Sequence, residues 1–576
     1  MNGFRRGGII SGLVTGLLLL AAGPAGAVDE PIIKDGRLIY PDGAEIPRYE
    51  TETERQYAKE YGLPPSLRAA TPPPGGPVHC VAEYEPMEGV LIAWRAFTTL
   101  LSQMTQRLTT NGAIVYVVVN SALEQNSANN TLTAGGSNMA NVRFVVRTLD
   151  TVWIRDYGPR YVYEGACRAI VDHKYNRPTR LNDDAFPPYF GTLKKHTYYE
   201  YQNMYGNQQL IHGGGNYHLD ALGRGYATRL INNENPTLTE PQIVDIWSRY
   251  ISVNTALQTP FPTSVDATQH IDMWMQIAGD NKVIISDWPY NAGSTQDNIC
   301  DGAAAAMAAA GYTVHRVPAR NLSGVHYTFT NVVICNNVVL VPLYTNTNIT
   351  NAPEQVPGQG PVNLNTQAFN AWAAAMPGYT LYQLNCDAIV PSAGVMHCVV
   401  MHLPRNSGGV NPTAYLRVPR GGEVFTPGSQ VNVQWISDDD LATTTADVRL
   451  SLNGGATYDT VLAAGIADNG SYLWTVPNTC TSRARIRVVV RDASGNTGFD
   501  SSPADFRIPA QPCPGDLNCD GFVNPADAPA MALALVNPTA YAAAHPGCPS
   551  ANGDLNGDQV LNGGDVQDFV EAINGP

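Results

Sequence analysis

Cys398 lies in the stretch Gly-Val-Met-His-Cys-Val-Val-Met-His-Leu-Pro, which runs from Gly394 to Pro404. A thiolate is a strong nucleophile, so this cysteine could bond covalently to an electrophilic carbon. A buried strand cysteine or half of a disulfide would look the same locally, because cysteine is common in protein cores. The neighbouring residues leave both interpretations open, and the segments upstream must decide between them.

A Trp, an Arg and an Asp stand close together in the segment Asp150–Pro159, which is Asp-Thr-Val-Trp-Ile-Arg-Asp-Tyr-Gly-Pro. The Asp156 carboxylate could accept two parallel N–H bonds from a guanidinium group. The Trp153 ring could cover the flat face of that group. The alternative is a surface ion pair between Arg155 and Asp156 beside a core tryptophan.

His270 and Asp272 are two residues apart in the segment Gln269–Trp274. If this segment is a strand, its period of two places both side chains on one face. The pair would then supply a proton carrier and a second carboxylate at one site. The alternative is a satisfied core histidine beside an edge aspartate. Asn331 follows later, in the polar run Thr-Phe-Thr-Asn.

Three glycines precede Asn216 in the run His-Gly-Gly-Gly-Asn. Glycines such as Gly215 have no side chain, so their backbone can approach a ligand closely. The run does not match a phosphate-binding loop, because no Lys-Ser/Thr follows it. A simple glycine-rich turn is the alternative.

These segments fall in a region of alternating strand and helix patterns, from Cys80 to about Pro404. Short β-branched runs predict strands at Val90–Trp94, Ile114–Val119, Val142–Val146, Lys282–Ser286, Val332–Ile334 and Val338–Leu343. Helix-like stretches are Phe97–Leu108, Gln242–Tyr250, Ala303–Ala310 and Gln367–Met376. The alternation predicts an α/β domain. Periodicity alone leaves a barrel, a doubly wound sheet and a propeller open.

The ordered set Trp-x-Arg-Asp-x-Gly-Pro, Gly-Gly-Asn, His-x-Asp and a late His-Cys resembles the Porphyromonas-type peptidylarginine deiminase family, which is akin to the agmatine deiminases. An early pattern from Glu85 to Trp94 is also similar. The resemblance covers about Cys80 to Pro404 and favours the nucleophile interpretation of Cys398. It implies a pentein-type α/β propeller with approximate fivefold repetition.

By analogy with that family, Asp156 and Asp272 would bind the two sides of a guanidinium, and Cys398 would attack its central carbon. His270 would protonate the departing ammonia and then help to activate water. Of the remaining implied site residues, Asn331 would orient the site and Trp153 would form one side of it. Gly215 and Asn216 would bind substrate. This chemistry needs no metal or organic cofactor, because carboxylates align the cation and the thiolate attacks.

The substrate is predicted to be arginine in peptides. The Gly-Gly-Asn form resembles the peptidylarginine branch, whereas agmatine-type enzymes usually carry Glu-Gly-Gly there. Arg177 and Arg180 could bind the terminal carboxylate of a peptide, or they could be solvated loop charges. The alternatives are a deiminase of agmatine or another free guanidine, an amidino transferase, and a non-catalytic scaffold that binds arginine side chains.

Residues 1–27 have the features of a secretory signal peptide, with Arg5 and Arg6 before the apolar run Leu13–Ala22 and Ala-Gly-Ala at the cleavage site. No later apolar stretch is long enough to span a membrane. The protein is therefore expected to be secreted or extracytoplasmic, with no stable membrane span after cleavage. Residues 28–79 form a polar N-terminal segment that ends in the proline-rich linker Thr71–Pro77.

Two regions follow the α/β domain of residues 80–405. Residues 412–509 contain alternating segments separated by Asn-Gly-Gly and Asp-Asn-Gly turns, which predicts a β-sandwich. This region resembles bacterial immunoglobulin-like modules. Residues 512–576 hold a duplicated acidic loop with a helix-like stretch after each copy, which predicts a small helical Ca²⁺-loop domain.

Oxygen ligands recur at matching positions of the two acidic loops, and Ca²⁺ prefers such a set. The predicted ligands are Asp516, Asn518, Asp520, Phe522 and Asp527 in the first loop, and Asp554, Asn556, Asp558, Val560 and Asp565 in the second. The pair resembles a type I dockerin repeat, which implies a cohesin-like or cell-surface partner. Gln559 stands where such loops usually have glycine, so the second loop's geometry is the less certain one.

Charge and cysteine content set two further limits. The net charge is −15 and no basic run occurs, so nucleic acid is not expected as a partner. Hydrophobic residues make up 44% and charged residues 15%, as in a globular chain. Ten cysteines in an oxidising compartment predict disulfides. If Cys398 is free, the other nine cannot all pair within the chain.

Overall fold

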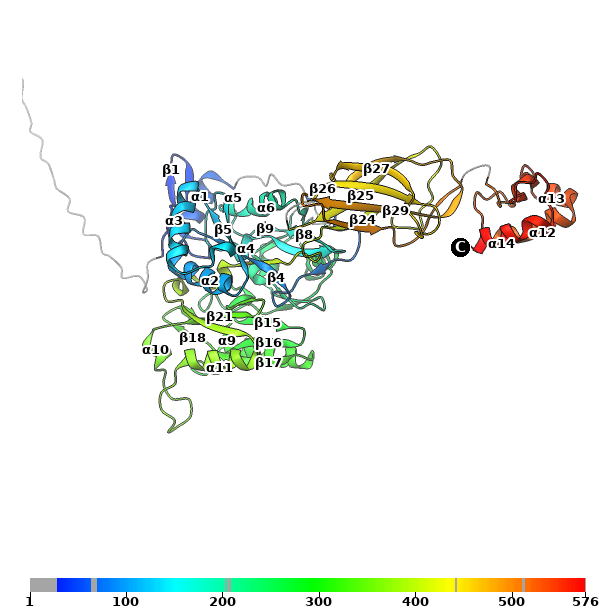
Figure 1. The fold of residues 1–576 in the computed structure, drawn as a ribbon. Coiled ribbons are helices and arrows are strands. Elements are labelled where there is room, and N and C mark those ends of the chain that lie inside the picture. The colour runs from blue at the N-terminus through cyan, green and yellow to red at the C-terminus, as the bar shows by residue number, and fades with distance from the viewer. Residues whose placement is uncertain are drawn as a thin grey trace, which may run out of the picture.

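The computed structural model describes residues 28–63, 70–201, 205, 209–440, 443–509 and 513–574 (Figure 1). The expected signal peptide of residues 1–27 lies outside the described residues. Among the residues that the structure describes, no helix is long and apolar enough to cross a membrane. The chain forms a large α/β body, two antiparallel sheets beside it, and a group of short helices near the C-terminus (Figure 1).

The body is built from five strand units with the same pairing pattern. In each unit the first and second strands pair antiparallel, and the second and third pair parallel. The units are β7 (Arg160–Glu164), β8 (Cys167–Asp172), β10 (Thr197–Glu200); β12 (His218–Leu219), β13 (Arg224–Thr228), β14 (Asn254–Gln258); β15 (Met275–Gly279), β16 (Lys282–Asp287), β17 (Thr313–Pro318); β20 (Val333–Cys335), β21 (Val338–Leu343), β22 (Thr380–Asn385); and β23 (Met401–Pro404), β4 (Met87–Ala93), β5 (Ile114–Val119).

A helix connects the second and third strands of each unit, because parallel neighbours need a crossover connection. These helices are α2 (Thr98–Thr110), α6 (Phe186–Lys194), α8 (Glu240–Ile251), α9 (Thr295–Ala309) and α11 (Leu364–Ala375). In α8 the buried residues Ile243, Ile246, Trp247 and Tyr250 recur at helical spacing and form one apolar face. The prediction of an α/β domain for this region is confirmed. β23, near the end of the body, pairs with β4, near its beginning, and so joins the two ends.

Further elements extend or link the units. They are β3 (His79–Cys80), α3 (Ala122–Ala134), β6 (Val142–Val146), β9 (Lys174–Tyr175), α5 (Leu181–Asp184), β11 (Ile211–His212), α7 (Leu230–Glu234), β18 (Arg320–Leu322), β19 (Val325–Tyr327) and α10 (Thr347–Thr350). The main hydrophobic cluster runs through four of the units and includes five buried tryptophans. This core gives the loops at the strand ends a rigid support.

The N-terminal segment packs against the body and is not a free tail. It contains β1 (Ile32–Lys34), β2 (Arg37–Ile39) and α1 (Glu52–Tyr61). The helix begins with a capping box, in which Thr51 and Glu54 each bond the other's backbone N–H. Between β2 and α1, residues 40–51 have no regular structure, and several of their polar groups bond to the body.

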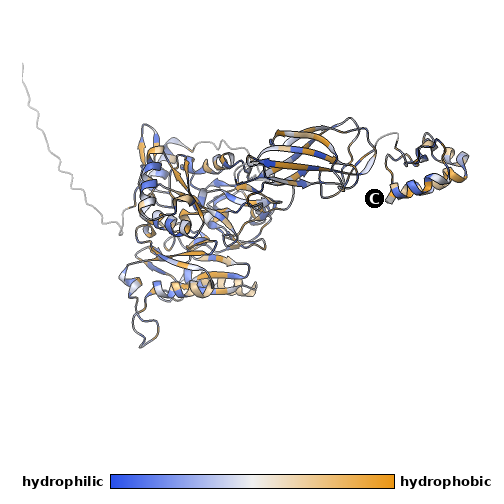
Figure 2. Ribbon diagram, in the orientation of Figure 1, coloured by the Kyte–Doolittle hydropathy of each residue, from blue (hydrophilic) through white to orange (hydrophobic). Residues whose placement is uncertain are grey.

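Two antiparallel sheets share one hydrophobic cluster after the body. Apolar and polar residues alternate along their strands, so each sheet turns one face to that cluster (Figure 2). One sheet contains β24 (Thr413–Val418), β25 (Gln430–Asp438) and β28 (Ser471–Thr475); the other contains β27 (Thr460–Ala467), β26 (Thr443–Ser451), β29 (Thr481–Asp492), β30 (Thr497–Ser501) and β31 (Phe506–Ile508). Arg168 of the body pairs with Asp438 of β25 at 2.8 Å, with both side chains fully buried.

The last region contains α12 (Ala528–Val536), α13 (Pro538–Ala544) and α14 (Val566–Asn574), and it lies beyond the two sheets (Figure 1). Cys519 and Cys548 form a disulfide within it, and Cys480 and Cys513 join it to the sheets. The other six cysteines, including Cys398, are unpaired and buried. Cys398 thus keeps the free thiol that a nucleophile requires.

Candidate active site

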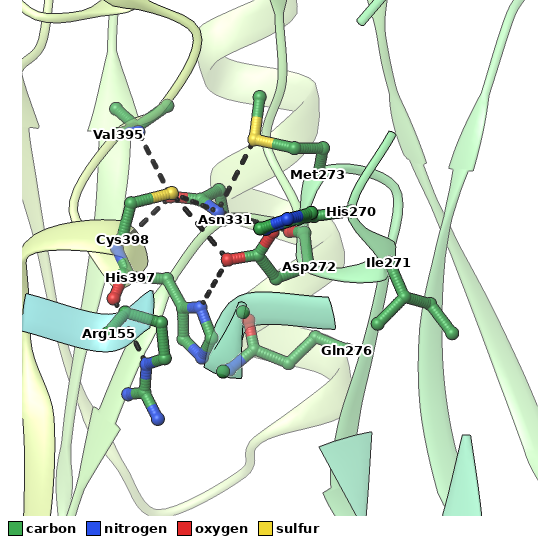
Figure 3. Close-up of polar contacts among 12 residues, drawn as sticks. Arg155, His270, Ile271, Asp272, Met273, Gln276, Asn331, Val395, His397 and Cys398 are labelled. Carbon is green, nitrogen blue, oxygen red and sulfur yellow. Dashed lines mark hydrogen bonds and ion pairs between the residues drawn. The ribbon is translucent and has the colours of Figure 1, made fainter. Parts of the chain in front are cut away.

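Four short helices at the strand ends bring the predicted site residues together. They are α4 (Ile154–Tyr157), η2 (Gly214–Asn216), η3 (Ile271–Met273) and η5 (His397–Val399). η5 contacts α4, α4 contacts η2, and η2 contacts η3. Asp156, His270, Asp272 and Cys398 meet there, each at most 1% exposed. Cys398 Sγ lies 3.6 Å from Asp272 Oδ2 (Figure 3).

His270 and Asp272 do not lie on a strand, so that prediction is wrong. Gln269 adopts a left-handed φ of 60°, which breaks the extended backbone before His270. The chain then makes one turn of 3₁₀-helix, η3, before β15 begins at Met275. This turn directs both side chains into the site by a different backbone path.

Two asparagines hold the short helices in place. Asn216 Oδ1 accepts the backbone N–H groups of Thr228 and Ile271 at 3.0 and 3.1 Å, so Asn216 supports η3 through the backbone. Asn331 Oδ1 accepts the N–H groups of Val395 and His397. The Asn331 amide nitrogen also lies 3.1 Å from Cys398 Sγ (Figure 3). Asn331 therefore positions the cysteine loop and contacts its thiol.

The space between the two carboxylates is filled by Arg48, a residue that sequence analysis missed. Its Nε and Nη2 donate to Asp156 at 2.8 and 2.7 Å, and Nη1 and Nη2 donate to Asp272 at 3.1 Å each. Nη1 is 2.7 Å from Cys398 Sγ, and Nη2 is 2.7 Å from His270 Nδ1. The site therefore holds a guanidinium between two carboxylates, a thiol and an imidazole.

The main chain beside Arg48 is also bound by predicted site residues. Arg177 Nε donates to the Arg48 carbonyl at 3.0 Å, and the Arg48 N–H donates to the Ser392 carbonyl at 3.0 Å. Trp153 Nε1 donates to the Ile46 carbonyl at 2.8 Å. The Trp153 ring lies beside Gly394, where an added Cβ would meet both the ring and Cys398 Sγ.

Arg180 does not present a free guanidinium to the site. It is fully buried, it pairs with Glu54 at 2.8 Å, and it donates to the carbonyls of Pro47 and Tyr49 at 2.9 Å. The carboxylate that Arg180 binds here is an internal one from α1. The prediction that Arg180 binds the carboxylate of a peptide end therefore finds no free guanidinium here.

Glu83 and His397 form a second layer of polar contacts that sequence analysis also missed. His397 Nδ1 is 2.9 Å from Asp272 Oδ2 (Figure 3). Its Nε2 is 3.0 Å from Glu83. Arg155 pairs with Glu83 at 2.8 Å, so Arg155 and Asp156 do not form the surface pair considered above. Glu83, His218 and His397 are close enough to share a cation. In this structure the two nitrogens of His397 are used to hold Asp272 and Glu83.

The sequence matches the Porphyromonas-type peptidyl-arginine deiminase family over residues 79–404, more than half of the chain. This chain belongs to that family. Its members are deiminases, which act on guanidino C–N bonds. The sequence is 25% identical over 192 residues to an agmatine deiminase of Stutzerimonas stutzeri, covering 31% of this chain and 52% of that protein. It is 32% identical over 120 residues to a putative agmatine deiminase of Yersinia pestis, covering 20% and 33%. The chain thus spans about half the length of the first relative and a third of the second.

Two solved structures are similar to this deiminase-family chain at low identity. An agmatine deiminase of Enterococcus faecalis matches with a TM-score of 0.48 and 15% identity, covering 58% of this chain and 100% of that one. A putative arginine deiminase of Porphyromonas gingivalis matches with a TM-score of 0.47 and 16% identity, covering 57% and 99%.

The protonation states in this family member follow from burial and from the Arg48 guanidinium. Burial would raise the pKa of Asp156 and of Asp272, but Arg48 together with the neighbouring histidines holds both below their usual range. Burial and then Arg48 lower the pKa of His270. Burial raises the pKa of the Cys398 thiol, and Arg48 partly opposes that rise. With a guanidinium bound, the thiol and the imidazole therefore share one proton.

The pH profile of kcat in this family member is expected to be broad and flat. The Cys398–His270 pair needs one shared proton, so activity falls only when the pair gains or loses one. Because the pKa of His270 is lowered, the acid limb is expected below the ordinary histidine value of about 6.5. Because the pKa of Cys398 is raised, the alkaline limb is expected above the ordinary thiol value of about 8.5. Steady-state kinetics at a saturating guanidine substrate measure both limbs; an acid limb at or above 6.5 contradicts this expectation.

Gly215→Ala is expected to prevent guanidinium binding. A Cβ at Gly215 would lie 1.9 Å from Arg48 Nη2 and within 2.8 Å of both carboxylates. Neither carboxylate can retreat without losing the cation, so kcat/KM for guanidine substrates should fall at least about a hundredfold. Gly302→Ala on α9 is the matched control, because nothing lies within 4 Å of its Cβ position. Equal kinetics for the two variants would refute the steric argument.

Proposed function

We propose that this protein is a peptidyl-arginine deiminase, which hydrolyses the guanidinium of arginine in peptides to give citrulline and ammonia. The observation that supports this most directly is Arg48 itself, an arginine with peptide on both sides that fits the site. All three of its guanidinium nitrogens are bound, and so are its main-chain N–H and carbonyl. A site of this kind suits peptidyl arginine.

The reaction begins when the proton shared by the Cys398–His270 pair lies on His270, and the Cys398 thiolate attacks Cζ of the bound guanidinium. Asp156 and Asp272 align the cation and stay ionised, so Cζ is held beside the sulfur. Attack forms the S–Cζ bond and a tetrahedral adduct. His270 contacts Nη2, so Nη2 takes a proton from His270 and leaves as ammonia. A thiouronium remains on Cys398.

Hydrolysis of the thiouronium completes the reaction. His270, now neutral, takes a proton from a water molecule that occupies the space left by ammonia. The water oxygen bonds to Cζ, and collapse of the adduct breaks the S–Cζ bond. The products are a ureido group and the free thiol of Cys398. Asn331 supports both steps because it contacts Sγ and fixes the backbone around His397.

Agmatine is the second candidate substrate, because the relatives named above are agmatine deiminases. Agmatine has no carbonyl for the Arg177 contact, so that contact favours peptides. The two candidate substrates are distinguished by incubating wild-type protein and the Arg48→Gln variant with an arginine peptide and with agmatine. Product is measured as ammonia and as the mass change when NH is replaced by O. Exclusive turnover of agmatine overturns the peptide proposal, and no turnover by either protein favours the arginine-binding scaffold.

We further propose that the protein is exported, as its N-terminal sequence indicates, and that the two sheets form an immunoglobulin-like module. The five-unit body is proposed to act as the α/β propeller of its family. The last region is proposed to be a dockerin-like Ca²⁺-binding domain with a cohesin-like or cell-surface partner. The two loops support it with matched bonds: Asp527 accepts the N–H groups of Leu517 and Asn518, and Asp565 those of Leu555 and Asn556.

Calcium is expected to stabilise residues 513–574. Gln559 adopts a positive φ of 69°, like Gly521 at 88°, so the second loop follows the path of the first despite its missing glycine. With Ca²⁺ at 100 times its Kd, binding should add about 2.7 kcal/mol to the unfolding free energy of this region. Thermal unfolding with Ca²⁺ and with a chelator measures the shift. The control is Asp527→Asn with Asp565→Asn; an equal shift in this variant would contradict the assignment.

A further inference from the structure

We propose that Arg48 is a modification site: Cys398 of the same chain converts it to citrulline, and this opens the site to external peptides. The inference rests on the proposed function. Residues 40–51 would thus be an internal substrate. The site would act on it before acting on any other arginine.

The guanidinium of Arg48 is bound as a substrate and not as a structural ion pair. Each of its five N–H donors has an acceptor: Asp156 takes two, Asp272 takes two and Cys398 Sγ takes one. A purely structural arginine would not need a nucleophile at Nη1 and a proton carrier at Nη2. These two contacts are the ones that the proposed reaction requires, so conversion is the expected outcome.

Arg48 also blocks the site while it is present. Its side chain is 0% exposed, and all three of its guanidinium nitrogens are bound by site residues. Both substrate carboxylates are occupied by it. External turnover therefore requires Arg48 to leave or to lose its charge.

The segment is held on both sides of Arg48 by contacts that a free peptide would also make. Trp153 and Arg177 bind the carbonyls of Ile46 and Arg48, and Arg180 binds those of Pro47 and Tyr49. Glu54 anchors α1 through its buried pair with Arg180. This anchor is on the same chain, so Arg48 meets Cys398 within one molecule, and the rate of that meeting does not depend on protein concentration.

The conversion follows the steps given above and needs only water. The S–Cζ bond forms, the Cζ–Nη2 bond breaks and ammonia leaves; the water oxygen then replaces Nη2, and the S–Cζ bond breaks. No electron donor or acceptor takes part. The ureido group that results is neutral, so Asp156 and Asp272 lose their cation and become available to another guanidinium.

The test measures the mass of the residue-48 peptide in full-length protein, digested with a glutamyl protease. The wild type is expected to gain the mass of an NH-to-O change at residue 48, at a rate independent of dilution, whereas Cys398→Ser is not. Cys398→Ser mixed with wild type is expected to keep arginine at residue 48. Conversion in trans at the same rate overturns the same-chain proposal. So does unmodified Arg48 in a wild type that converts external peptides.

Variants at residue 48 test the blocking role. Arg48→Gln removes the charge, and its progress curves on an external arginine peptide are expected to lack the lag of the wild type. Arg48→Lys keeps a charge that cannot be deiminated, so its turnover is expected to fall at least tenfold below that of Arg48→Gln. Identical progress curves for all three proteins overturn the blocking role. If Arg48→Gln converts no peptide and Arg48 is unmodified in the wild type, the proposed function itself fails.

Discussion

Cys398→Ser is expected to lower turnover of arginine peptides by at least about a thousandfold. The serine oxygen is a poor nucleophile at neutral pH, because its hydroxyl stays protonated. Burial already raises the pKa of the thiol, so a hydroxyl, with a still higher pKa, would ionise even less. Ammonia release in steady state measures the loss. Mass spectrometry of quenched wild type should also show a covalent adduct that the variant lacks.

Cys386→Ser is the matched control for that experiment. Cys386 is fully buried and unpaired, and its thiol donates to the Leu384 carbonyl, a bond that serine can also make. It makes no contact with the described site, so its kcat should stay close to that of the wild type. A comparable loss in both variants would mean that the effect comes from folding and not from a missing nucleophile.

Asp156→Asn is expected to reduce kcat/KM for arginine peptides about a hundredfold to several thousandfold. Asp156 accepts two of the five guanidinium N–H bonds in a fully buried site. Removing one partner of a buried ion pair costs roughly 3–5 kcal/mol. An asparagine cannot accept both bonds, because its amide nitrogen is a donor. Both a higher KM and a lower kcat are expected, since the Asp156 carboxylate binds the guanidinium and also aligns it for attack.

The control for Asp156→Asn is Asp245→Asn on α8, where the carboxylate pairs with Arg249 at the surface. Exposed pairs of this kind contribute about 0–1 kcal/mol, so its kinetics should be unchanged. Thermal unfolding of both variants separates lost binding from lost folding. Wild-type kinetics in a folded Asp156→Asn would show that the carboxylate is not needed for binding guanidinium.

Most residues of the site could be predicted from the sequence, because each motif contains residue types with a characteristic chemistry. Asp156, Asp272 and Cys398 were named from local residue types and their order, and the structure brings them together around one cation. The backbone around His270 could not be predicted the same way. A left-handed Gln269 breaks the alternating period, and nothing in the composition of the segment marks that break.

Arg48 and Glu83 were missed for a different reason. Each acts through a partner far along the chain: Arg48 reaches Cys398 across 350 positions, and Glu83 reaches His397 across 314. A single Arg in the polar run Ile-Pro-Arg-Tyr-Glu has no local feature that indicates burial. Arg180 was expected to bind an external carboxylate, and its actual partner, Glu54, emerges only once α1 packs on the body.

The buried pair between Arg168 and Asp438 determines how the chain can be divided. Arg168 of β8 also bonds Glu88 of β4, so one arginine ties two units of the body to the sheets that follow it. A chain cut after Pro404 would leave Arg168 without Asp438, and Glu164 without Arg417. The cut would also remove the sheet residues that shield both groups from water, and would lose these contacts between the body and the sheets. A truncated body is therefore expected to unfold at a lower temperature than the full chain, which thermal unfolding of the two proteins would measure.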